Sequence, residues 1–347
     1  MKAAWSNYNE AKAVIALALC LLFTTVGSVR CQDQCERIMQ QDSTLNNLID
    51  PPGYKTCPLG TLGGVEKAGT GPQPMVLIPG LGFGGDIFRD FMTSHLTQYT
   101  MYAVTLPGMG GTPAPPSPPE TVSFGEQTWT TGALSAIEKL IQDKGLDRPI
   151  VLGHWIGGTQ IALRLALSHP ERVKAVILVS GSACMVPTDT ARFPTRLSLD
   201  QRTKATDLYM APLWFKTVTR ETWDDNNFLP GDYAVNPVRG LRLWRQAATP
   251  PLHVWVRYLC EFNAQDIGLS LDSLAVPTLL IRPGLEGAAE ESGSKYLEGY
   301  CHKSWELPVV TGGKFQMVTV PNSRVCLWYD QPSTYDSLIE AFVNVLD

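Results

Sequence analysis

The stretch that decides the fold is Val151-Leu152-Gly153-His154-Trp155-Ile156-Gly157-Gly158, near the middle of the 347-residue chain. An apolar run ends here and a segment of helical period begins, so a glycine-rich turn joins a strand to a helix. Gly153 and Gly157 flank the turn, where larger side chains would collide in so tight a bend. Such a turn raises its central side chain above the end of the sheet, and that side chain is Trp155.

Short apolar runs and segments of helical period alternate around this turn. Four apolar runs, at residues 75–79, 101–106, 150–152 and 173–180, are largely continuous and resemble strands buried on both faces of a sheet. Two more strands are expected at residues 277–282 and 315–320. Helical period is found at residues 86–96, 124–144, 159–168, 294–305 and 333–346. In the longest of these, one face carries Leu134, Ile137, Leu140 and Ile141. The alternation predicts an α/β fold with a mostly parallel central sheet flanked by helices.

The alternation stops between residues 182 and 274. This segment shows little strand pattern and contains the tryptophans Trp214, Trp223, Trp244 and Trp255. We interpret it as a helical cap between the two parts of the core, residues 62–181 and 275–347. Residues 29–61 are largely polar and form an N-terminal leader. The aromatic side chains of the cap have two possible roles: lining an apolar pocket at the edge of the sheet, or forming the cap's own core.

Three further segments give the turn its context. Pro79-Gly80-Leu81-Gly82 follows the first core strand, and the second is followed by Thr105-Leu106-Pro107-Gly108-Met109-Gly110-Gly111-Thr112. The helix after the turn leads to Ser168-His169-Pro170-Glu171-Arg172-Val173. In this order the segments resemble the oxyanion loop, the D-x-P-G-x-G-x-S segment and the elbow-to-strand connection of the α/β-hydrolase superfamily. The turn itself resembles the family's nucleophile elbow, G-x-S-x-G. The resemblance runs from about residue 62 to the C-terminus and implies an α/β-hydrolase fold.

The resemblance also assigns the positions of a catalytic triad, and two of them have changed. Trp155 occupies the nucleophile position, where an indole offers an N–H but no nucleophilic lone pair. Counting back five places from Asp330 in Asp330-Gln331-Pro332 places Val325 at the position of the catalytic His. Glu286 lies near the register of the acid. The chain therefore resembles a divergent member with a degenerate triad, for which the usual mechanism is unavailable.

Other polar groups near the turn remain as candidates. The oxyanion donors of the family are backbone groups, so we expect Leu81 and Ile156, beside Gly80 and Gly82, to keep an N–H pair that faces a pocket. His154 is expected to pack or to hydrogen-bond locally. Cys326 follows the vacant His position, and burial or a disulfide is the preferred interpretation of that thiol.

The N-terminal residues predict export. Lys2 and Lys12 precede a mostly apolar run at residues 13–26, and Val26-Gly27-Ser28 offers the small residues that a signal peptidase accepts. As a helix this run would span about 21 Å, short of the roughly 30 Å of a hydrocarbon core. We therefore predict a signal peptide at residues 1–28, a secreted or periplasmic protein, and no stable membrane insertion.

Composition bounds the partners and cofactors. The 28 Lys and Arg against 33 Asp and Glu give a net charge of −5, which argues against general binding to nucleic acid. The chain has eight cysteines, and a bridge from Cys31 or Cys35 to Cys57 would be local in an oxidising compartment. The five histidines are scattered, so neither a metal nor another cofactor is predicted.

Three functional hypotheses follow. The first is a non-hydrolytic protein that binds a small, partly apolar ligand. The second is an active hydrolase of ester or C–C bonds with relocated catalytic groups, for example Cys326 with His253 or His302. The third is a protein-interaction module, which a filled pocket with Trp155 packed against aromatic residues of the cap would favour.

Overall fold

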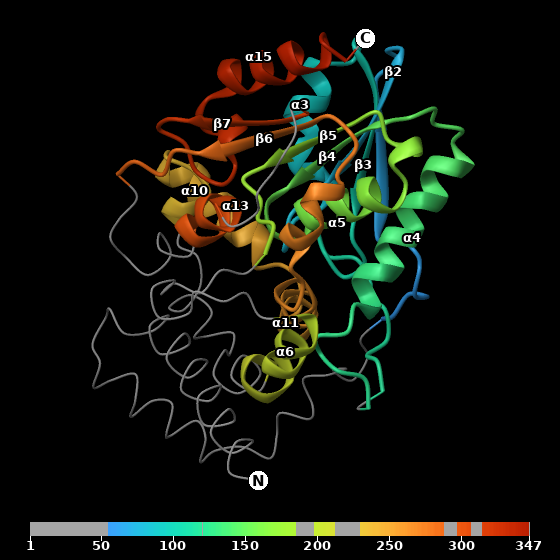
Figure 1. The fold of residues 1–347 in the computed structure, drawn as a ribbon. Helices are drawn as coiled ribbons and strands as arrows, with labels where there is room; N and C mark the ends of the chain where they lie inside the picture. Colours follow the sequence, from blue (N-terminus) through green and yellow to red (C-terminus); the bar gives the residue numbers. More distant parts are fainter. Residues whose placement is uncertain are drawn as a thin grey trace.

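The computed structural model describes residues 55–119, 121–184, 198–211, 230–287, 297–306 and 314–346. These residues form a sheet of seven strands in the order β1-β3-β2-β4-β5-β6-β7 (Figure 1). Every neighbouring pair is parallel except β1 and β3. The strands are β1 (Gly64–Ala68), β2 (Gln73–Ile78), β3 (Tyr99–Thr105), β4 (Ile150–His154), β5 (Ala175–Val179), β6 (Thr278–Pro283) and β7 (Phe315–Val320). The predicted α/β fold with a mostly parallel sheet is confirmed.

Burial explains which strands the sequence predicted. Every residue of β4 and β5 is buried, so these strands are continuously apolar and easy to recognise. The edge strand β1 was not predicted. Its residues alternate between half-buried and exposed, and two of them are the charged Glu66 and Lys67. A five-residue edge strand with this composition resembles a loop in the sequence.

Helices cover both faces of the sheet. The short η2 (Gly85–Phe88), α3 (Arg89–Ser94) and α15 (Pro332–Val343) lie on one side, and α4 (Thr128–Asp143) and α5 (Trp155–Ser168) lie on the other (Figure 1). The predicted apolar face of α4 is buried, with Ile137 fully covered. The remaining short helices of the core are η3 (Pro170–Arg172), η6 (Gly299–Lys303), α13 (Ser304–Glu306) and α14 (Leu327–Asp330).

The described elements between β5 and β6 are all helical. They are α6 (Leu199–Ala205), η4 (Thr206–Met210), α9 (Pro230–Tyr233), α10 (Pro237–Ala247), α11 (Leu252–Asn263) and η5 (Ile267–Ser273). Helix α10 begins where the Asn236 side chain accepts hydrogen bonds from two N–H groups of its first turn. We refer to these elements together as the cap. Trp255 of the cap is buried and Trp244 is half-buried, whereas Trp214 and Trp223 lie outside the described residues.

Several predictions concern segments that are not described. The predicted signal peptide lies there, as do Cys31 and Cys35, the expected partners of Cys57. The five cysteines within the described ranges form no disulfide with one another. None of the described helices has both the length and the apolar character needed to cross a bilayer.

Candidate active site

The glycine-rich turn joins β4 to α5 with an unusual backbone. Trp155 has a φ of +49°, in the left-handed region, and Gly157 follows with a φ of +92°. Between them Ile156 is extended, with a ψ of 132°, so the first turn of α5 is interrupted. A Cβ on Gly153 would overlap the Gly158 carbonyl, and one on Gly157 would lie 2.6 Å from the Phe262 ring. Both elbow glycines are therefore required by space, and Gly157 is also required by its backbone angle.

The indole of Trp155 is fully buried at the end of the sheet. Its ring meets Tyr233 edge-on, with 5.4 Å between centroids and an interplanar angle of 80°. Phe83 lies on another side at 6.2 Å. Phe83 follows the expected oxyanion loop, whereas Tyr233 ends α9 of the cap. Trp155, at the predicted nucleophile position, is thus part of an aromatic cluster that joins the core to the cap.

The N–H groups of the expected oxyanion loop have partners within the protein. Leu81 N–H donates to the Ile156 carbonyl at 2.8 Å. Gly80 N–H donates to His154 Nδ1 at 3.4 Å, and Gly82 N–H contacts the Met109 sulfur at 3.3 Å. The extended ψ of Ile156 aims its carbonyl, and not an N–H, at Leu81. Leu81 N–H, one of the two expected oxyanion donors, is therefore engaged within the protein in the described conformation. The pair as an oxyanion site stays a prediction.

His154 is a structural residue, as the sequence suggested. Because Gly80 N–H donates to Nδ1, the ring proton lies on Nε2, which donates to the Val325 carbonyl at 3.2 Å. The ring is fully buried, and burial lowers the pKa of His154 to about 3. Trp328 packs edge-on against the ring with centroids 4.7 Å apart. A neutral His154 thereby links the oxyanion loop, the elbow and the loop after β7.

The loop that holds the vacant His position is hydrogen-bonded to the cap. Val325 is fully buried, and its N–H donates to the Asp232 carbonyl at 3.2 Å. The next residue, Cys326, donates its N–H to the Tyr233 carbonyl at 3.0 Å. Burial raises the pKa of the Cys326 thiol well above its usual value, which makes it a poor nucleophile at neutral pH.

Glu286 lies where the acid of the triad is expected, but its carboxylate contacts a backbone N–H group and bonds to no histidine among the described residues. The side chain is exposed, and its carboxylate accepts a hydrogen bond from Asn322 N–H at 2.8 Å. That hydrogen bond is the main cause of the lowered pKa of Glu286. Arg324 joins the same loops, donating to the Glu286 carbonyl at 3.0 Å and to the Gly231 carbonyl at 3.1 Å. The acid loop and the loop after β7 are thus adjacent, but they exchange backbone bonds instead of an acid–histidine bond.

The candidates for a relocated site have ordinary surroundings. The ring Nε2 of His302 lies 2.8 Å from the Pro283 carbonyl, and His253 is buried in α11. The Cys301 thiol donates to the Ser180 carbonyl at 3.2 Å. Among the described residues, no group of three or more His, Cys, Asp or Glu side chains could hold a metal ion.

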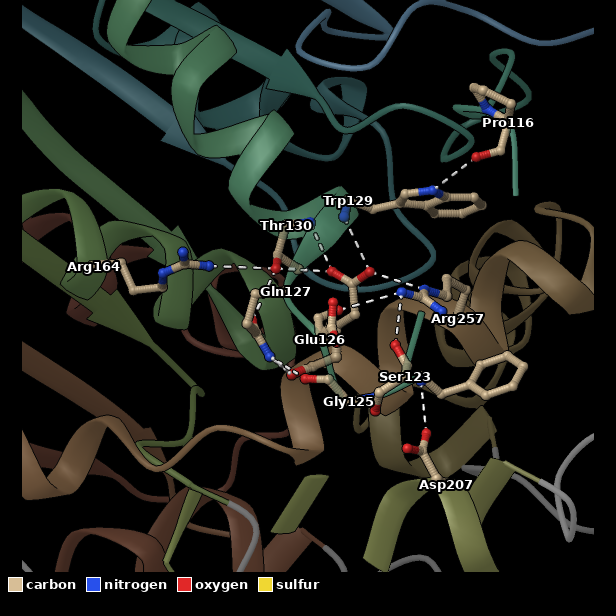
Figure 2. A network of polar contacts seen from close by, with 12 residues as sticks. Pro116, Ser123, Gly125, Glu126, Gln127, Trp129, Thr130, Arg164, Asp207 and Arg257 are labelled. Atoms are coloured by element: carbon tan, nitrogen blue, oxygen red, sulfur yellow. Dashed lines mark hydrogen bonds and ion pairs between the residues drawn. The ribbon is translucent and has the colours of Figure 1, made fainter. Parts of the chain in front are cut away.

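A second polar site, which sequence reasoning missed, lies where the cap helix α11 meets α4 (Figure 2). The fully buried Glu261 carboxylate accepts from Trp129 N–H at 3.0 Å and from Thr130 N–H at 2.8 Å, both in the first turn of α4. The Thr130 hydroxyl donates to it at 2.9 Å, and so does Arg257 Nε at the same distance. A carboxylate at this place satisfies free N–H groups and complements the helix dipole.

Arg257 extends this network toward the segment before α4. Its Nη2 donates to the carbonyls of Ser123 at 3.2 Å and Glu126 at 3.3 Å (Figure 2). Its guanidinium lies over the Phe124 ring, 5.3 Å from the centroid. Burial raises the pKa of Glu261, while Arg257 and the donors of α4 oppose that shift. A charged pair spaced i, i+4 inside an otherwise apolar helix is the sequence signal that marks the site.

Known proteins share this architecture. A family model described as the alpha/beta hydrolase fold matches residues 73–208. The pimeloyl-acyl-carrier-protein methyl ester esterase of Aeromonas hydrophila subsp. hydrophila is 30% identical over 125 residues, which cover 36% of this chain and 44% of that enzyme. The match thus spans less than half of the relative's own length.

Solved structures agree with this assignment. An esterase from Exiguobacterium antarcticum superposes with a TM-score of 0.57 and 17% identity, covering 80% of this chain and 94% of that chain. The enol-lactonase from Burkholderia xenovorans gives a TM-score of 0.53 and 13% identity, with 81% and 96% covered. Together with the sheet order, these matches show that the chain has the α/β-hydrolase fold.

Proposed function

We propose that this protein is a non-hydrolytic member of the superfamily that acts by binding. The observation that carries the proposal is the 2.8 Å hydrogen bond from Leu81 N–H to the Ile156 carbonyl beside the buried Trp155. Oxyanion donors supply a large part of the catalysis of acyl transfer, and here the protein itself uses one of them. The nucleophile position has no nucleophile, and the His position holds Val325.

An active hydrolase is the alternative that the names of the relatives suggest, since they are esterases and a lactonase. It would require catalytic groups outside the family's positions. The burial of Cys326 and its raised pKa argue against that thiol as the nucleophile. His154 is neutral and hydrogen-bonded on both nitrogens, which leaves it no free base function.

The burial of Trp155 at the elbow limits which ligands this protein could bind there. A small apolar ligand at the elbow would have to displace Trp155 from its contacts with Phe83 and Tyr233. This favours binding through another part of the molecule, and it supports a protein-interaction module as the second candidate function. The packing of Trp155 on a cap aromatic is the specific observation in favour of that candidate.

Binding at the elbow is testable with a fluorescent fatty-acid probe. We expect no saturable binding by the parent protein, and binding by Trp155→Ala, which opens a space lined by Phe83 and Tyr233. Trp305→Ala, which opens a space away from the elbow, is the control. Saturable binding by the parent protein would restore the apolar-ligand hypothesis.

Hydrolysis is tested with p-nitrophenyl esters of several acyl lengths. We expect the parent protein to match the rate in buffer alone. A Trp155→Ser, Val325→His double variant should remain slower than an esterase by at least the roughly 10²–10³ that one oxyanion donor contributes, because Leu81 stays bonded to Ile156. Turnover by the parent that is lost in Cys326→Ala but kept in Cys57→Ala would overturn the proposal.

We also propose export to a secreted or periplasmic location, which rests on the apolar run at residues 13–26 and the small residues up to Ser28. Expression of the full chain in a secreting host, followed by N-terminal sequencing of the exported protein, checks it. The expected new N-terminus is Val29. Retention of the intact chain inside the cell would refute it.

A further inference from the structure

The chain bends at Ser180-Gly181-Ser182, directly after strand β5, and we refer to this segment as the turn after β5. Ser180 has a φ of +53°, a left-handed conformation that is uncommon for a residue with a side chain. A Cβ on Gly181 would overlap the side chain of Thr159 on α5, so the turn is pressed against that helix. Both serines are fully buried. Strained residues of this kind cluster at ligand sites.

The two hydroxyls of this turn have no hydrogen-bond partner among the described residues. Two amide atoms in the same region share that condition, Gln160 Oε1 and Gln265 Nε2. Both glutamine side chains are more than nine-tenths buried. Hydroxyl and amide groups that are buried in this way are normally satisfied by protein atoms or by ordered solvent.

Hydrogen bonds and a close packing contact bring these groups into one region. Gln160 Nε2 donates to the Phe262 carbonyl at 3.4 Å, and Gln265 N–H donates to the same carbonyl at 3.3 Å. Thr159, which touches Gly181, directly precedes Gln160. The turn after β5 and the two glutamines therefore meet at the carboxyl edge of the sheet, beneath the end of α11.

The charges nearby are already compensated. Asp266, next to Gln265, forms a buried ion pair with Arg202 at 3.1 Å. The four unpartnered atoms belong to neutral groups that offer both donors and acceptors. An ion at this place would lack a countercharge, which disfavours it strongly.

We propose that this region is a buried binding site for a small neutral molecule that carries a hydroxyl group, either water or an alcohol. Open α/β sheets bind ligands at the carboxyl ends of their strands, and this site lies at the end of β5, one strand away from the elbow on β4. The occupant donates to and accepts from the serine hydroxyls and the free glutamine atoms. The proposal goes beyond the non-hydrolytic function and does not depend on it.

Thermal unfolding of Ser180→Ala and Ser182→Ala tests the proposal by the sign of the change. If an occupant is bound, each variant removes one of its partners, and we expect Tm to fall by about 2–4 °C. If the site is empty, alanine removes an unsatisfied group, and Tm should rise. Tyr335→Phe is the matched control, because its buried hydroxyl also has no partner among the described residues but lies on α15. That variant should not lower Tm.

A crystal structure of the full exported chain, with and without an ethylene glycol soak, identifies the occupant. A single oxygen atom within hydrogen-bond distance of the Ser180 or Ser182 hydroxyl, unchanged by the soak, supports water. Its replacement by glycol, together with a larger glycol-induced Tm increase in the parent than in Ser182→Ala, supports an alcohol. Empty density together with a higher Tm in both serine variants overturns the proposal. None of these readouts uses hydrolysis, so their failure is separate from that of the proposed function.

Discussion

The elbow region and the contact between α4 and α11 both bury polar groups between the core and the cap, but they do so by different chemistry. At the elbow the links are neutral backbone bonds, such as Val325 N–H to the Asp232 carbonyl and Cys326 N–H to the Tyr233 carbonyl. At α11 the link is an ion pair, Glu261 with Arg257, surrounded by backbone donors. The fold thus fastens its cap by two kinds of contact, and the second includes a buried ion pair in which removal of one partner leaves the other charge uncompensated.

The energetic consequences differ accordingly. A neutral hydrogen bond contributes about 0.5–1.5 kcal/mol, so the elbow spreads its stability over many small contributions. A buried ion pair contributes little compared with apolar residues, yet removing one partner costs about 3–5 kcal/mol. Removing a single partner should therefore lower the free energy of unfolding more in the α11 ion pair than in the neutral hydrogen bonds of the elbow.

The largest expected effect is that of Glu261→Ala. The substitution strands Arg257 and the N–H groups of Trp129 and Thr130 in the interior, so we expect the free energy of unfolding in urea to fall by about 3–5 kcal/mol. The double variant Glu261→Met, Arg257→Met removes both charges and should cost less than the single one. A double variant that costs as much as the two single variants together would show that the charges do not act as a pair.

At the elbow, Gly157→Ala should cost about 1–3 kcal/mol more than Gly111→Ala. Both glycines have a positive φ, so both variants bear the same kind of backbone strain. They differ in space, because a Cβ on Gly157 would press on the Phe262 ring while one on Gly111 meets nothing within 4 Å. Equal urea midpoints for the two variants would mean that the elbow is less tightly packed than the structure indicates.

A third comparison uses pH. The pKa of His154 is about 3 in the folded protein and 6.5 for an unperturbed side chain. Between these values the unfolded chain binds a proton that the folded protein does not, so stability is lost as pH falls through this window, by about 1.4 kcal/mol per pH unit. His154→Gln should remove this part of the slope, while His169→Gln, at a partly exposed helix end, should keep it. Parallel slopes in parent and His154→Gln would contradict a neutral buried ring.

The smallest effect is expected for Glu286→Gln. The side chain is exposed, and the amide oxygen of Gln can still accept the hydrogen bond from Asn322 N–H. The urea midpoint should therefore stay within the scatter of repeated measurements. A large loss of stability would show that the acid position has a structural role like that of Glu261.

Local pattern was sufficient for most of the fold. The buried strands β4 and β5 and the apolar face of α4 were predicted because buried positions at strand or helix spacing are occupied by apolar residues. The edge strand β1 was missed because Glu66 and Lys67 interrupt that pattern. The Glu261 network was missed because its partners on α4 lie about 130 residues away in the chain.

The sequence by itself determined which side chains stand at the positions that the resemblance assigns to the nucleophile and the base, and neither Trp155 nor Val325 can perform those roles in any conformation. Only the tertiary structure decided the state of the oxyanion loop. That state depends on one backbone angle, the ψ of Ile156, which turns its carbonyl toward Leu81. Such an angle is set by packing from distant segments, and here the Phe262 ring of α11 packs against Gly157, the next residue along the chain. The chemistry of a side chain is fixed by its residue type, whereas the direction of a peptide group depends on all the segments that pack around it.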